Sequence, residues 1–196
     1  MSLLNLNLLY SQEQDESVKC TYSEVELAAD KSIAILRTEP KLVNTFTTFE
    51  KGRVIDFSLL NYEGKIILNL EIYRDSKAEL KPFCISPGDF FELKLINSES
   101  IVLPQVGRKL CSTELNSAQK GFQNTKNRGS FLITKENLEK IRQTELATGN
   151  LKAGEEEIYF VFKTETYDDV NDKVSYPSQY FIRFLNCVTH PKLVVK

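Results

Sequence analysis

The side chains that most often perform acid–base and nucleophilic chemistry are nearly missing from this sequence. His190 is the only histidine and lies close to the C-terminal end of the sequence, a poor position for a general acid or base. Serines and cysteines are present, but no partner base accompanies them. The sequence contains neither the Gly-x-Ser-x-Gly pattern of hydrolase nucleophiles nor a Gly-x-x-x-x-Gly-Lys-[Ser/Thr] phosphate loop. We therefore assign no catalytic residue and expect no cofactor.

Acidic residues are the remaining candidates for metal binding or catalysis. The run Asp168-Asp169-Val170-Asn171-Asp172 gathers the oxygen ligands that calcium prefers. It lacks the glycine and the distal glutamate of an EF-hand loop, so a solvated turn is the favoured interpretation and no metal ligand is assigned. A hydrolase with two carboxylates drawn from distant positions stays open as an alternative, including a glycan-directed one. The absence of tryptophan argues against the glycan-directed form, although tyrosine can supply an aromatic platform.

Basic residues gather in the polar stretch 105–129, which shows no sustained hydrophobic period. A loop of this length is uncommon in a compact domain and usually carries function. The residues that would form a ligand loop for an anionic molecule are Arg108, Lys109, Lys120, Lys126 and Arg128. The alternative is a surface loop that only keeps the protein soluble.

Charge and hydropathy exclude two broad classes of partner. The chain of 196 residues carries 25 basic and 27 acidic residues, for a net charge of −2. Such a balance provides no broad positive field for a phosphate backbone, so we expect no nucleic-acid binding. No apolar run reaches the roughly 18 residues of a transmembrane helix. The expected partner is therefore an unknown protein or small ligand.

The cysteines Cys20, Cys84, Cys111 and Cys187 can pair in three ways. Cys84 and Cys111 flank the hairpin predicted over 90–103, and Cys20 and Cys187 lie near the two chain ends, which are often close in space. We favour Cys84–Cys111 with Cys20–Cys187. Four free thiols, as in a cytosolic protein, are the main alternative, whereas zinc would need all four cysteines from scattered positions.

The N-terminus bears on the compartment. Residues 1–12 are rich in leucine and are followed by the polar run Glu13-Gln14-Asp15-Glu16. This pattern is typical of the end of a secretory signal whose basic start is missing. The alternative is a short edge strand in which Leu4, Leu6 and Leu8 alternate with asparagine. The first interpretation predicts a periplasmic or secreted protein, with cytoplasmic location as the alternative, and leaves 13–196 as one domain.

Strand patterns dominate the rest of the chain. Ile66, Leu68, Leu70 and Ile72 alternate with polar residues, which predicts a strand with one face in the core. The turn at 61–64 joins this strand to 54–60 as an antiparallel hairpin, and 90–96 pairs in the same way with 100–103. Further strands are predicted over 32–37, 42–49, 131–133 and 157–166, the last placing Phe160 and Phe162 in the core.

Two helices are predicted near the C-terminal end. Thr134 is a suitable N-cap for a helix over 135–142, which we expect to end at Gly149 or in the loop 151–154. Phe181, Phe184 and Leu185 fall at helical spacing, whereas Tyr180, Ile182 and Phe184 alternate like a strand. We favour the helix.

Three stretches resemble a loosely defined group of small exported bacterial domains of unknown function. The stretches are 64–74, 84–103, and 131–141 followed by 158–162. The shared pattern is a strand, an Ile-Ser-x-Gly-Asp turn that opens a hairpin, and Ile-[Ser/Thr]-Lys-Glu-x-Leu-Glu-x-Ile as a helix before another strand. The resemblance covers about half of the chain and implies a closing helix that ends near Cys187. The chain departs from this pattern at 105–129 and 163–177, and the resemblance implies no catalytic residue.

The sequence thus predicts an α+β or mainly β domain, an antiparallel sheet or sandwich with one or two helices. The expected function is binding or interaction by a non-catalytic, exported bacterial envelope domain. The alternative is the two-carboxylate hydrolase described above. An assembly subunit, the third interpretation, would show an exposed apolar patch or an unpaired edge strand.

Overall fold

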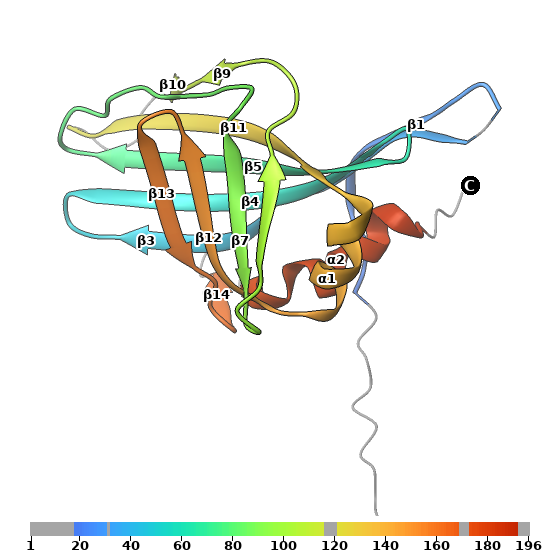
Figure 1. Ribbon diagram of the computed structural model, residues 1–196. Helices are drawn as coiled ribbons and strands as arrows, with labels where there is room; N and C mark the ends of the chain where they lie inside the picture. Colours follow the sequence, from blue (N-terminus) through green and yellow to red (C-terminus); the bar gives the residue numbers. More distant parts are fainter. Residues whose placement is uncertain (1–17, 31, 116–120, 169–172, 192–196) are drawn as a thin grey trace, which may run out of the picture.

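The computed structural model (Figure 1) describes residues 18–30, 32–115, 121–168 and 173–191. It is mainly antiparallel β-sheet with two short α-helices, which confirms the predicted fold class. Its strands are β1 (Tyr22–Leu27), β2 (Ile33–Thr38), β3 (Lys41–Thr47), β4 (Lys51–Tyr62), β5 (Lys65–Ser76), β6 (Cys84–Ile85), β7 (Phe90–Leu95), β8 (Ser100–Pro104), β9 (Leu110–Cys111), β10 (Thr113–Leu115), β11 (Gln123–Ile133), β12 (Leu146–Ala153), β13 (Glu156–Val161), β14 (Thr166–Asp168) and β15 (Lys173–Ser175). The helical elements are α1 (Lys135–Gln143), the 3₁₀ turn η1 (Pro177–Gln179) and α2 (Tyr180–Thr189).

The larger sheet is built around the hairpin of β4 and β5, which pair without interruption from Lys51 opposite Ser76 to Tyr62 opposite Lys65. β11 pairs with the other edge of β5, and β1, β2, β3 and β10 extend the sheet. The alternating apolar residues of β5 all face the core, where they pack with Phe160 and Phe162 as predicted. Those residues are Ile66, Leu68, Leu70 and Ile72.

A second sheet has the strand order β13-β12-β7-β8 and includes the predicted hairpin of β7 and β8. The two sheets meet on one side at a bridge between Gln105 and Phe131. On the other side, Asn44 and Arg53 donate side-chain hydrogen bonds to backbone carbonyls of β13, at 3.1 Å to Val161 and 3.2 Å to Tyr159. These bonds satisfy carbonyl groups on β13, which among the described strands is an edge strand paired with β12. The sheets therefore curl around one common core.

The helices lie together at one end of the sheets (Figure 1). Thr134 caps α1, and its Oγ1 accepts a hydrogen bond from the backbone N–H of Asn137, as the sequence predicted. The C-terminal segment is helical rather than extended, since Phe181 and Leu185 point into the core while Ile182 stays exposed. The buried ring of Tyr180 meets Phe57 edge-on, with ring centroids 5.3 Å apart, so α2 closes this end of the core.

The expected end of the first helix is wrong. α1 stops at Gln143, and the residues around Gly149 form β12 in the middle of the second sheet. A Cβ at Gly149 would lie 2.6 Å from Cζ of Phe160 and 2.9 Å from Cζ of Phe91. The glycine is therefore required by close packing of two aromatic rings against the strand, not by a helix terminus.

The expected loop over 105–129 is also wrong in large part. β9, β10 and the first half of β11 lie within it, and β11 pairs with β5 along its full length. In this part of β11 the inward side chains are polar: Thr125 is 4% exposed and Asn127 is 0% exposed. The usual alternation of apolar and polar residues is therefore absent, which explains why the strand was missed. Residues 1–12, and both interpretations of them, lie outside the described part of the chain.

Candidate binding site at the loop end

Two disulfide bonds hold the chain, and they are the two pairs that the sequence favoured. Cys20 is joined to Cys187 with Cα atoms 5.6 Å apart, and Cys84 to Cys111 with Cα atoms 3.8 Å apart. No free cysteine occurs. Disulfides form and persist in oxidising compartments and are rare in the cytosol of ordinary cells. The bonding of the cysteines thus favours a location outside the cytoplasm.

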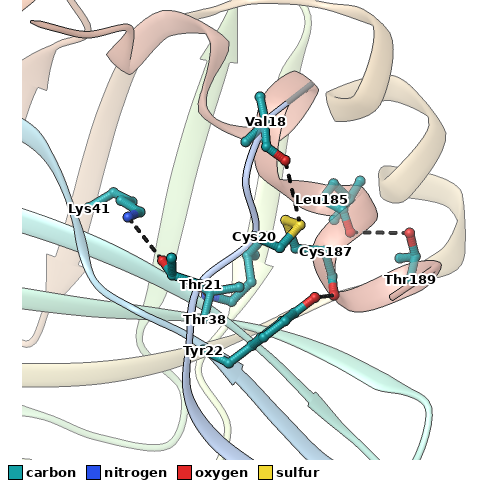
Figure 2. The surroundings of a disulfide bond; sticks show 10 residues. Val18, Cys20, Thr21, Tyr22, Thr38, Lys41, Leu185, Cys187 and Thr189 are labelled. Atoms are coloured by element: carbon teal, nitrogen blue, oxygen red, sulfur yellow. Dashed lines mark hydrogen bonds between the residues drawn. A yellow bond between two sulfur atoms is a disulfide. The ribbon is translucent and has the colours of Figure 1, made fainter. Parts of the chain in front are cut away.

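The first bond fastens the start of the described chain to α2 (Figure 2). Beside it, the hydroxyl of Tyr22 donates to the carbonyl of Cys187 at 3.0 Å, and Asn61 Nδ2 donates to the carbonyl of Val188 at 2.8 Å. Because these contacts satisfy carbonyls in the last turn of α2, the helix is tied to both β1 and β4. The contacts at this end of the molecule therefore stabilise the fold.

The second bond joins β6 to β9, a two-stranded unit that lies against β11. Asn127 Nδ2 donates to the carbonyl of Phe83 at 2.9 Å, and Ser112 Oγ lies 3.0 Å from Asn127 Oδ1. The backbone N–H of Phe83 in turn donates to Ser112 Oγ at 3.0 Å. The polar inner residue of β11 thus orients the segment that carries Cys84 and Cys111.

The described residues of the predicted ligand loop lie in two separate places in the fold. Lys126 and Arg128 lie on the outer face of β11, where both bind one carboxylate: Lys126 Nζ is 2.7 Å and Arg128 Nε 3.0 Å from Glu71. Arg108 and Lys109 lie in the segment between β8 and β9, and not on β11. Lys120 falls outside the described residues. The basic side chains of β11 are therefore matched by an acidic neighbour instead of being free for an anion.

The electrostatics of Glu71 fit a structural ion pair. Burial alone raises the pKa of Glu71, but hydrogen bonds from Lys126 and Tyr73, and the charges of Lys126 and Arg128, more than offset this. The net pKa is lowered, so the carboxylate stays ionised. Asp56 is its cross-strand neighbour on β4, so the sheet does place two carboxylates side by side. A general acid needs a raised pKa, and Glu71 shows the opposite shift.

The other chemical candidates are dispersed. His190 is exposed just beyond α2, with its Nδ1 3.0 Å from Thr189 Oγ1. The acidic run 168–172 lies almost entirely outside the described residues. Within the described ranges, no group of three or more histidine, cysteine or acidic residues is placed to hold a metal ion. No helix in the same ranges is long and apolar enough to cross a membrane.

An exposed aromatic residue lies instead at the end of the larger sheet where β3 turns into β4, with a half-buried one nearby. Phe49 lies in that turn and is 85% exposed. The ammonium group of Lys77, which follows β5, is 3.3 Å from the centroid of the Phe49 ring and 5.6 Å from that of Phe122. Because Lys77 N also donates to the carbonyl of Glu50, at 2.9 Å, the loops after β3, after β5 and before β11 converge here. We call this region the loop end.

Three polar residues lie beneath the loop end in one cross-strand row on the inner face of the sheet. We call them the arginine row: Arg53 on β4 is opposite Arg74 on β5, which is opposite Thr125 on β11. Each guanidinium group lies over a buried ring, Arg53 at 5.9 Å from Phe160 and Arg74 at 4.7 Å from Phe83. Burial lowers the pKa of both arginines, and the negative charge of Glu156 partly opposes this at Arg74. Both remain protonated cations.

Sequence reasoning missed the loop end and the arginine row. Phe49 follows a β-rich run and was assigned to a strand, although Lys51-Gly52 pointed to a chain reversal nearby. Arg53 and Arg74 begin or follow runs of apolar residues, where an arginine is usually a boundary marker. Their juxtaposition depends on the register of β4 and β5, which the sequence indicated only through the turn at 61–64. The structure places the turn at Glu63-Gly64, with Tyr62 opposite Lys65, so counting back from the predicted turn at 61–64 would have placed Arg53 opposite Ile72 instead.

Comparisons with known proteins found no match that bears on the fold or the site. No protein-family model matches the chain, and no curated protein and no solved structure matches it significantly.

Proposed function

We propose that this protein is a non-catalytic binding domain that works in an oxidising compartment, in the periplasm or after secretion, and binds its ligand at the loop end. The observation that carries the proposal is the placement of Phe49: the residue is 85% exposed, and a lysine ammonium group lies 3.3 Å from the centroid of its ring. Exposed aromatic side chains on loops held by a rigid scaffold are typical of recognition sites.

The arrangement of the disulfides supports the same proposal. The Cys20–Cys187 bond lies beside α2, whereas the aromatic residues lie where β3, β5 and β11 start or stop. The first bond therefore stabilises the α2 end, whereas Cys84–Cys111 holds the segment of Phe83, whose ring lies under Arg74 near the loop end. The hydrolase alternative receives less support, because the lowered pKa of Glu71 does not suit a general acid.

The proposal is tested by a thermal-shift screen of the wild-type protein against neutral and acidic oligosaccharides, peptides and organic acids. Each compound that raises the unfolding midpoint is then tested on Phe49→Ser and on Tyr159→Ser. Tyr159 is the matched control, because its ring is 56% exposed on the outer face of the second sheet.

The expected result is a shift that persists in Tyr159→Ser and is lost in Phe49→Ser, with the compound recovered unchanged by mass spectrometry. Equal shifts in both variants would place the binding elsewhere. Cleavage of the compound would favour the hydrolase, and a screen without any shift would reject binding for these ligand classes.

A further inference from the structure

We propose that the arginine row is a binding site for an oxyanion, that is, a carboxylate, phosphate or sulfate group carried by the ligand. This inference rests on the proposed function, because it names the chemistry that the loop end recognises. The three residues of the row, Arg53, Arg74 and Thr125, come from adjacent strands and share the inner face of the larger sheet.

The first argument is the juxtaposition of two like charges. Side chains directly opposite each other in an antiparallel pair have Cβ atoms roughly 4.5–5.5 Å apart, and like charges at such positions destabilise the sheet. Arg53 and Arg74 occupy these positions on the two longest strands of the fold. An anion bound between or beside them would remove this repulsion.

The second argument is the lack of an acidic partner. Within the described part of the chain, neither Arg53 nor Arg74 makes an ion pair. Glu156 acts on Arg74 only through its longer-range charge. On the opposite face of the same sheet, Lys126 and Arg128 share the carboxylate of Glu71. The outer cations are therefore neutralised by the protein, and the inner ones are not.

The third argument is the number of unused donors. Each guanidinium group has five N–H donors. Arg53 Nη2 binds the carbonyl of Tyr159 and the amide oxygen of Asn44, at 3.2 and 3.5 Å, and Arg74 Nη2 binds the carbonyl of Lys81 at 3.1 Å. The Nε atoms of both arginines and the hydroxyl of Thr125 are buried without a hydrogen-bond partner. Buried donors of this kind are costly unless a ligand or water satisfies them.

The geometry also suits an oxyanion better than a metal or a neutral ligand. Guanidinium groups form paired N–H bonds to carboxylate and phosphate oxygens, and the pairing depends on the orientation of the plane. Phe160 and Phe83 lie under the two guanidinium groups, so each group has an aromatic ring on one side. Since the Nε atoms are enclosed, binding requires the side chains to turn toward the ligand, and this movement is directly observable.

The test follows the Nε–Hε resonances of Arg53 and Arg74 by NMR in the wild-type protein, during titration with sodium phosphate, sodium sulfate and sodium acetate. Sodium chloride keeps the ionic strength constant. The same titrations are run on Arg53→Gln, Arg74→Gln and Thr125→Val. Arg128→Gln is the matched control, because it removes an arginine from the outer face, where the side chain is 63% exposed.

The expected result is a saturable shift of both Nε–Hε resonances with at least one of the three anions. Either glutamine variant should weaken the affinity by at least about tenfold, and Thr125→Val by less, while Arg128→Gln binds like the wild type. Comparison of the three anions identifies the group: acetate alone indicates a carboxylate, and phosphate or sulfate alone indicates the corresponding ester.

The proposal would be overturned by resonance shifts that grow linearly without saturation, or that are equal in Arg74→Gln and Arg128→Gln. The arginine row would then have only a structural role at the edge of the core. If the glutamine variants fail to fold, the wild-type resonances still decide, and Arg74→Lys keeps the charge while removing the Nε donor. If no oxyanion binds the row while screened ligands still bind through Phe49, this inference is rejected and the proposed function stands. Saturable oxyanion binding without any ligand bound through Phe49 would reject the proposed function and leave the arginine row as an oxyanion site separate from it.

Discussion

Asn127 Nδ2 donates a hydrogen bond of 2.9 Å to the backbone carbonyl of Phe83, which lies 44 residues earlier in the chain. Through this bond, a polar side chain of β11 supports the segment that carries the Cys84–Cys111 disulfide. The first half of the inner face of β11 is thus polar, and the contribution of Asn127 to stability can be measured.

Replacement of Asn127 by alanine should lower the free energy of unfolding by about 1–3 kcal/mol, because the carbonyl of Phe83 and the hydroxyl of Ser112 would lose a buried partner. Urea denaturation followed by circular dichroism measures the change. Asn186→Ala is the control: Asn186 is exposed on α2, and its loss should change stability by no more than about 0.5 kcal/mol. Equal effects of the two substitutions would contradict the structural role of Asn127.

The apolar face of β5 should carry a large part of the stability. Leu68 is 0% exposed and lies in the centre of the core, so Leu68→Ala should cost about 2–5 kcal/mol, since it removes buried methyl groups and leaves a cavity. Val102, half exposed on β8, provides the comparison, and Val102→Ala should have little effect. A loss below about 0.5 kcal/mol for Leu68→Ala would show that the register of β5 is wrong.

The two disulfides should contribute different amounts to the free energy of unfolding, because they close chain segments of different length. The sequence separation is 167 residues for Cys20–Cys187 and 27 for Cys84–Cys111. On the chain-entropy estimate, removing the first bond costs about 5 kcal/mol and removing the second about 3.5 kcal/mol. Chemical denaturation of the double alanine variants C20A/C187A and C84A/C111A tests this order. Thiols that react with an alkylating reagent in the non-reduced protein would contradict the bonding itself.

Low pH should reduce the contribution of Glu71 to the stability of the fold. Its pKa is lower in the folded protein than in the unfolded chain, so it stabilises the fold above the unfolded value of about 4.3, and this contribution disappears as the pH falls through the folded pKa. The free energies of unfolding of wild type and Glu71→Gln should therefore differ more at about pH 6 than at about pH 3. A difference that does not depend on pH would show that the ion pairs with Lys126 and Arg128 contribute nothing.

Local patterns in the sequence were sufficient for several elements. The alternation of apolar residues from Ile66 to Ile72 fixes which face of β5 is buried, because successive side chains on a strand point to opposite faces. The threonine N-cap and the spacing of Phe181 and Leu185 identify both helices, since capping and helical periodicity are local properties. The position of each cysteine relative to a predicted hairpin or chain end indicated the favoured pairing.

Only the tertiary structure decided the character of β11, the role of Gly149 and the existence of the arginine row. Asn127 faces inward although it is polar, because it finds partners 44 residues away at Phe83 and 15 residues away at Ser112. Gly149 is needed because two rings from other strands pack against it. Arg53 and Arg74 become neighbours through strand register, which depends on hydrogen bonds summed over the whole hairpin. Contacts between distant segments decide such features, and no short window of the sequence contains both partners.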